Sequence, residues 1–113
     1  MTLEQITIRG ARIEDLGPIM QLEQNNFGTD SWSEATMRDE LVANHTHYLV
    51  AAIVDQVTGT ESVVGFGGLS KHGSHDQSDI QTVAVAEDMR GKGIGRRLMN
   101  ELVGIARDLD AQT

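Results

Sequence analysis

The stretch MRGKGIGRRL, residues 89–98, gathers three glycines and four basic side chains into ten residues. It follows an alternating apolar segment, Ile80 to Ala86 (IQTVAVA), whose pattern is typical of a β-strand. After it, Ile94, Leu98, Leu102, Ile105 and Leu109 recur at the spacing of one helical face, which predicts a long amphipathic helix packed on a sheet. A strand, a glycine-rich turn and a helix N-terminus therefore follow one another directly.

This order of elements suits an anion. The first amides of a helix have no partner within the helix and lie at the positive end of its dipole. Glycine lets the preceding backbone turn tightly and approach a bulky group. We therefore expect a phosphate or diphosphate to bind where the turn enters the helix.

The chain is acidic overall, so an anion must be bound by a local group of donors. The chain of 113 residues has 9 Lys and Arg against 17 Asp and Glu, a net charge of −8 at pH 7. This balance disfavours nucleic acid and anionic membranes as partners. With no cysteine, the chain forms neither disulfides nor thiolate zinc sites, and no apolar run is long enough to cross a bilayer. We expect a single-domain cytoplasmic protein.

The preceding residues predict a strand, two helices and a hairpin. Trp32 and Met37 are placed to form a hydrophobic staple around an N-cap at Ser33, although Trp32 could equally line a groove. The predicted elements are a strand at 5–10, a helix from Glu14 with Leu16, Ile19, Met20 and Phe27 on one face, a helix within 30–44, and strands at 47–54 and 62–70 joined through Thr58 and Gly59.

Three glycines interrupt the strand at 62–70. Gly65, Gly67 and Gly68 weaken its β-propensity. They indicate either a bulge, which we favour, or a place where another backbone or a ligand comes close.

Comparison with known phosphate-loop motifs restricts the range of possible ligands. The Walker A pattern is absent, and Leu98 occupies the position of the third glycine in the dinucleotide fingerprint G-x-G-x-x-G. The pattern that is present, Arg90-x-x-Gly93-x-Gly95, resembles the coenzyme A diphosphate loop of the GNAT superfamily of N-acetyltransferases, R/Q-x-x-G-x-G/A.

The resemblance extends over essentially the whole chain. The segment TDSWSEATM, residues 29–37, looks like the PWSE-type segment of the RimI-like branch, the ribosomal-protein alanine N-acetyltransferases, with Ser31 where a proline is common. The resemblance implies an α/β (α+β) fold with a mixed, mostly antiparallel sheet flanked by helices. It also implies that residues 1–113 form one such domain without the family's usual C-terminal strands and helix.

The resemblance further implies the ligands and their contacts. Acetyl-CoA would be the cosubstrate and a primary amine the acceptor, such as a protein N-terminus, with no metal. Strand backbone would pair with the pantetheine arm, and the loop would hold the diphosphate. By position, the coenzyme contacts fall on Val83, Ala84, Val85, Arg90, Gly91, Lys92, Gly93, Ile94, Gly95 and Arg96.

No catalytic residue is assigned, because the branch's glutamate base and tyrosine acid lie in the portion beyond residue 113. Tyr48, the only tyrosine, is predicted to pack in the core. Asp79 and Glu87 flank the strand at 80–86 and could relay a proton through water, but we interpret them as solvated strand ends.

The histidines and the outer strand raise other possibilities. His45, His47, His72 and His75 lack the carboxylate pattern of a metal site, so we expect solvated side chains. Two alternatives to an enzyme stay open: a truncated module that binds coenzyme A without turnover, and an interaction protein that pairs through the exposed edge of its fourth strand, for example as a homo-oligomer.

Overall fold

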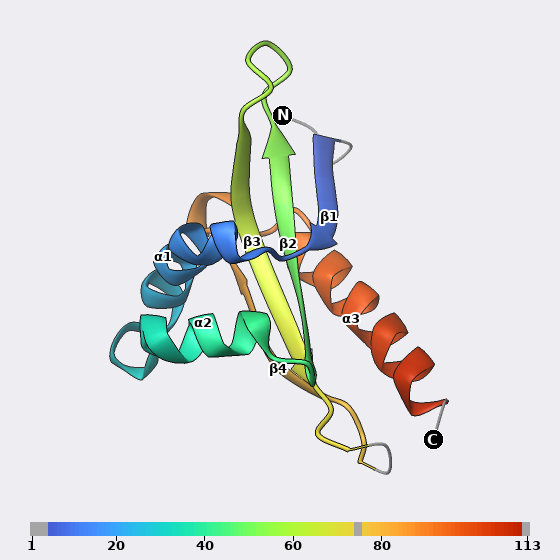
Figure 1. Cartoon of the computed structure of the whole chain (residues 1–113). Helices are drawn as coiled ribbons and strands as arrows, with labels where there is room; N and C mark the ends of the chain where they lie inside the picture. Colours follow the sequence, from blue (N-terminus) through green and yellow to red (C-terminus); the bar gives the residue numbers. More distant parts are fainter. Residues whose placement is uncertain (1–4, 74–75, 112–113) are drawn as a thin grey trace.

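The computed structural model describes residues 5–73 and 76–111 and contains one four-stranded sheet. The strands lie in chain order, and each pairs antiparallel with the next (Figure 1). They are β1 (Ile6–Gly10), β2 (Thr46–Val54), β3 (Glu61–Ser70) and β4 (Asp79–Val85). The predicted α+β class and the β2–β3 hairpin are confirmed, and the described part of the sheet is antiparallel throughout rather than mixed.

Helices cover both faces of this sheet (Figure 1). The first two, α1 (Leu16–Phe27) and α2 (Glu34–Val42), pack on one face, and α3 (Ile94–Asp110) packs on the other. Three short 3-10 turns precede α1, follow it and follow β4, at Ile13–Asp15, Gly28–Asp30 and Glu87–Met89. None of the helices in the described part has the length and apolar character of a membrane span.

Each face has its own apolar core. On the α1 and α2 side, buried side chains include Ile19, Met37 and Phe66, and on the α3 side they include Ile94 and Leu98. The sheet therefore carries apolar side chains on both faces and holds α1 and α3 in fixed positions on opposite sides of β4.

Two helical predictions need correction. Phe27 is 38% exposed, because it ends α1 where the chain turns into the Gly28–Asp30 segment. On α3, Leu98 and Leu102 are fully buried, whereas Ile105 and Leu109 are only half-buried. The apolar stripe thus forms core in the first half of the helix only.

The start of α2 agrees with its prediction. Ser33 is the N-cap, and its hydroxyl oxygen accepts a hydrogen bond from the Thr36 amide at 3.1 Å. Trp32 is half-buried and packs against the same apolar cluster as Met37, which supports the staple interpretation.

The glycines of β3 combine irregular pairing with close packing. The register shifts opposite Ala51 and Ala52 and again between Gly68 and Leu69, so the predicted bulge is confirmed. A Cβ on Gly67 would lie 2.9 Å from Leu102 Cδ1, and one on Gly68 would overlap the Tyr48 ring. Close approach is therefore also present, and the groups that approach are side chains of α3 and β2.

Candidate functional site

The connection from β4 to α3 is built on left-handed glycines. Gly91 has φ +80° and Gly93 has φ +84° with ψ 8°, backbone angles that side-chain-bearing residues rarely adopt. Gly93 is the N-cap of α3, so its conformation sets the direction in which the helix begins. The glycine spacing recognised in the sequence therefore has a defined backbone role.

The N-terminus of α3 is open. No side chain caps it in the described structure, which leaves the first-turn amides available to an outside acceptor. Gly95 has no positive φ, and a Cβ there would lie 3.6 Å from Val85 Cγ2, an ordinary contact. The protein itself does not require glycine at this position, and the missing side chain leaves space beside the amides. A cavity of about 510 Å³ lies here, bounded by Val85, Met89 and residues of the loop and first turn.

The four basic side chains of the stretch divide into two pairs. Arg90 donates from Nη2 to Asn26 Oδ1 at 2.6 Å and from Nε to the Val85 carbonyl at 3.3 Å. Arg97 donates from Nη1 to the Ile6 carbonyl at 3.3 Å. These two arginines fasten the loop and helix to α1, β4 and β1.

Lys92 and Arg96 form the second pair. Both are exposed, and neither makes a hydrogen bond or ion pair with any described residue. They flank Gly93 and Gly95, next to the open amides of the first turn. The structure thus brings together open N–H groups and two exposed cations, which is the donor set that a diphosphate requires.

Two of the predicted coenzyme contacts, one on β4 and one on α3, can be made only by backbone. Ala84 and Ile94 are 3% and 1% exposed, so their side chains belong to the core. The Val85 carbonyl receives Asn26 Nδ2 and Arg90 Nε, each at 3.3 Å, and these two donors match its two acceptor lone pairs. Sequence reasoning missed Asn26, because an asparagine near a helix C-terminus carries no signal for a contact 59 residues away.

A second hollow lies beside β4 on the α1 face. It has a volume of about 160 Å³ and is lined by Glu23, Phe27, Asp30, Trp32, Gln81 and Thr82. Glu23 is only 4% exposed, and its Oε2 accepts a hydrogen bond from the Trp32 amide at 2.8 Å. Sequence reasoning missed Glu23 as well, since a glutamate in an amphipathic helix is usually read as solvated.

The other acid–base candidates have structural positions. Tyr48 is buried, and its hydroxyl donates to Glu40 Oε1 at 2.9 Å. Burial, followed by the nearby Glu40 carboxylate, raises the pKa of Tyr48. The predicted packing role is confirmed by the place of Tyr48 in the buried cluster under α1 and α2. Asp79 and Glu87 are exposed at opposite ends of β4, as the solvated interpretation expects.

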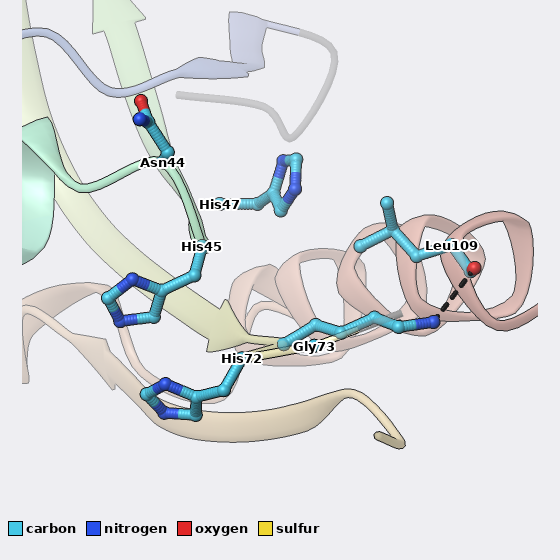
Figure 2. A pocket seen from close by; sticks show the side chains of 7 residues that line it. Asn44, His45, His47, His72, Gly73 and Leu109 are labelled. Atoms are coloured by element: carbon cyan, nitrogen blue, oxygen red, sulfur yellow. Dashed lines mark hydrogen bonds between the residues drawn. The ribbon is translucent and has the colours of Figure 1, made fainter. Parts of the chain in front are cut away.

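The three described histidines, His45, His47 and His72, lie at the far end of the sheet (Figure 2). His45 and His72 stack with ring centroids 4.4 Å apart, and His47 lies apart from this pair, across a cavity of about 370 Å³. The described residues contain no group of three or more possible metal ligands. His75 lies outside the described residues.

Comparisons with known proteins identify the family. Residues 16–113 match the acetyltransferase (GNAT) family. The chain belongs to this family. It is 35% identical over 107 residues to the N-alpha-acetyltransferase RimI of Mycobacterium tuberculosis, covering 92% of this chain and 64% of the relative. It is 26% identical over 106 residues to a putative [ribosomal protein bS18]-alanine N-acetyltransferase of Bacillus subtilis, covering 93% of this chain and 64% of that protein.

Solved structures extend the likeness to the fold. A Mycobacterium tuberculosis protein crystallised with CoA aligns with a TM-score of 0.71 and 30% identity, covering 92% of this chain and 59% of that one. The ribosomal-protein-S18-alanine N-acetyltransferase of Escherichia coli shares the fold at a TM-score of 0.71 and 19% identity, covering 91% and 60%. The chain therefore spans about three fifths of the length of these relatives.

Proposed function

We propose that this chain binds acetyl-CoA and transfers its acetyl group to a primary amine. The observation that carries the proposal is the uncapped N-terminus of α3, reached through Gly91 and Gly93 and flanked by the exposed Lys92 and Arg96. Family membership and the 30% identical relative crystallised with CoA support this choice of ligand.

The coenzyme would lie along β4 and across the start of α3. The diphosphate would accept hydrogen bonds from the amides of Gly93, Ile94, Gly95 and Arg96, with the pantetheine arm beside the backbone of Val83 and Ala84. Hydrogen bonds to a charged group contribute about 1.5–3 kcal/mol each, enough for this cradle to dominate affinity in a protein of net charge −8.

The acceptor fits the hollow on the α1 face. Gln81 and Thr82 line it, two residues and one residue before Val83 along β4, so it adjoins the end of the proposed pantetheine path. Glu23 and Asp30 supply carboxylates, and Trp32 supplies an aromatic wall, which suit an amine that arrives protonated. We propose a protein N-terminal α-amine, of the ribosomal-protein alanine type named for the relatives, and a cytoplasmic location.

The reaction balances without a covalent enzyme intermediate. The arriving ammonium first gives one proton to water, the neutral amine then attacks the thioester carbonyl to form the C–N bond, and the C–S bond breaks to release coenzyme A thiolate. The amine loses one proton and the thiolate gains one. The chain has no cysteine that could carry the acetyl group, and direct transfer requires none.

A thiol-release assay tests this proposal. The chain is mixed with acetyl-CoA and a peptide that begins with alanine, and free thiol is followed over time. The control is the same peptide with its N-terminus already acetylated. Release with the free peptide only is expected. Binding of CoA by calorimetry without any release would instead identify a coenzyme-binding module.

The edge of the sheet favours a second candidate. In the described structure β4 pairs with β3 alone, so its other edge is available to a strand from another chain. We propose this edge as the site of any homo-oligomer. Light scattering tests it: a strictly monomeric, folded chain at high concentration would exclude strand recruitment between copies.

A further inference from the structure

Arg90 opens the R-x-x-G-x-G pattern, yet its guanidinium is occupied by the protein. Its Nη2 lies 2.6 Å from Asn26 Oδ1 and its Nε lies 3.3 Å from the Val85 carbonyl oxygen. A hydrogen bond from an ionised donor at this distance belongs to the strong class. The first residue of the loop is therefore held against α1 and against the end of β4.

Asn26 connects Arg90 to α1 and β4 through both the oxygen and the nitrogen of its side-chain amide. Its Oδ1 accepts from Arg90, while its Nδ2 donates to the Leu22 carbonyl at 2.8 Å and to the Val85 carbonyl at 3.3 Å. The donor end faces two carbonyls and the acceptor end faces a cation, so the surroundings are consistent with one orientation of the amide. One side chain on α1 thus joins the strand end and the loop start.

We propose that Asn26 is a positioning residue for the coenzyme loop and acts through Arg90; this inference rests on the proposed function. The loop contains two left-handed glycines, Gly91 and Gly93, directly after Arg90. Glycine loses more conformational freedom on ordering than any other residue. Fixing Arg90 orders the loop before the ligand arrives, so less entropy is lost on binding.

The inference assigns different duties to the basic side chains. Arg90 holds the backbone in the binding geometry, whereas Lys92 and Arg96 have no partner among the described residues and can meet the diphosphate. A direct role for Arg90 makes a different prediction, because its loss would then weaken binding whatever residue stands at position 26. A double-mutant cycle separates these two roles.

The variants are Asn26→Ala, Arg90→Ala and the double variant, with Asn25→Ala as the matched control. Asn25 is the neighbouring asparagine on the same helix and is exposed, and its side chain makes no hydrogen bond within the described structure. Alanine is a better helix former than asparagine, so α1 should persist in both alanine variants. Circular dichroism and thermal unfolding of the free proteins verify this.

The affinity for CoA is then measured by calorimetry. Asn26→Ala and Arg90→Ala should each weaken binding on the order of tenfold, as expected for loss of one hydrogen bond to a charged group. The double variant should be no weaker than either single variant, and Asn25→Ala should stay within twofold of the wild type.

Two results would contradict the positioning role of Asn26 and leave the proposed function standing. One is an Asn26→Ala chain that binds CoA within twofold of the wild type. The other is a double variant whose loss equals the product of the single losses, since Arg90 would then contact the diphosphate independently of Asn26. A wild-type chain that does not bind CoA at all would overturn the proposed function and this inference with it.

Discussion

Each end of α3 lies next to a hollow, and the two ends differ in which backbone and side-chain groups the protein leaves without a partner. The helix spans 17 residues, Ile94–Asp110, or about 25 Å at 1.5 Å per residue. At the N-terminus, amides and two cations face outward. At the C-terminus, Lys71 Nζ donates to the Leu109 carbonyl at 3.0 Å and to Asp110 at 3.2 Å, so the helix end is satisfied by the protein itself.

The difference shows that polar side chains near a cavity do not by themselves make a binding site. The hollow at the C-terminal end holds His45 and His72, but their rings stack on each other (Figure 2). The hollow at the N-terminal end has fewer unusual side chains and more unpaired backbone. We infer that the unpaired donors, and not the histidines, mark the functional end of the helix.

The largest expected effect comes from placing a carboxylate on the open end. Gly93→Asp puts a negative charge and a side chain at a position with φ +84°. CoA binding measured by calorimetry should fall by at least about 100-fold, through charge repulsion and the strained backbone. Gly104→Asp is the control, because Gly104 lies on the same helix with open space around it. Equal binding by the two variants would contradict the loop assignment.

Gly95→Ala is expected to weaken CoA binding less than Gly93→Asp does, and to raise the stability of the free protein. The added Cβ meets Val85 at an ordinary contact distance, so the fold tolerates it. The free protein should gain up to about 1 kcal/mol of stability from helix propensity, while CoA binding weakens about tenfold because the methyl group occupies space beside the amides. Gly104→Ala should show the gain in thermal unfolding without the loss in binding. Unchanged CoA affinity for Gly95→Ala would mean that no ligand approaches there.

At the other end of α3, a substitution should affect stability only. Lys71→Met keeps the apolar stem but removes the ammonium group that binds the Leu109 carbonyl and Asp110. Its side chain is 10% exposed, so the loss should cost about 1–2 kcal/mol in denaturant unfolding. CoA affinity should stay within twofold of the wild type. A large loss of CoA affinity in a folded Lys71→Met chain would contradict the claim that only the N-terminal end of α3 binds the coenzyme.

The smallest effect is a pH dependence at the same end. Burial alone would raise the pKa of Asp110, but hydrogen bonds from Lys71 and Ser78 outweigh it and lower that pKa. The contribution to stability is therefore complete above the unfolded-state pKa, and it is lost as the pH falls below that value and through the lower folded-state pKa. Asp110→Asn and Lys71→Met should both flatten this part of the stability profile. An unchanged slope in Asp110→Asn would refute the assignment.

Elements with a strong local signal were predictable from the sequence. The N-cap at Ser33 and the glycine spacing around Gly93 depend on backbone conformations that few residues support, so their positions followed from residue type. The register of β3 did not follow, because it depends on Tyr48 and Leu102 packing onto glycines from elsewhere in the chain.

Only the backbone features of the candidate site could be predicted from the sequence. The sequence placed four basic residues in one stretch, but which two of them find hydrogen-bond partners within the protein depends on where α1 and β1 lie. Arg90 meets Asn26 across 64 positions, and Arg97 meets Ile6 across 91. Glu23 became notable only once the fold buried it beside Trp32. Such contacts depend on tertiary packing that no local pattern encodes.

The most direct test of the central claim is a titration of the ¹⁵N-labelled chain with CoA, followed by amide chemical shifts. The account predicts the largest shifts at the amides of residues 91–96 and negligible shifts at His45, Lys71 and His72. Shifts concentrated at the histidine end, with residues 91–96 unmoved, would contradict the proposal that the open N-terminus of α3 holds the diphosphate.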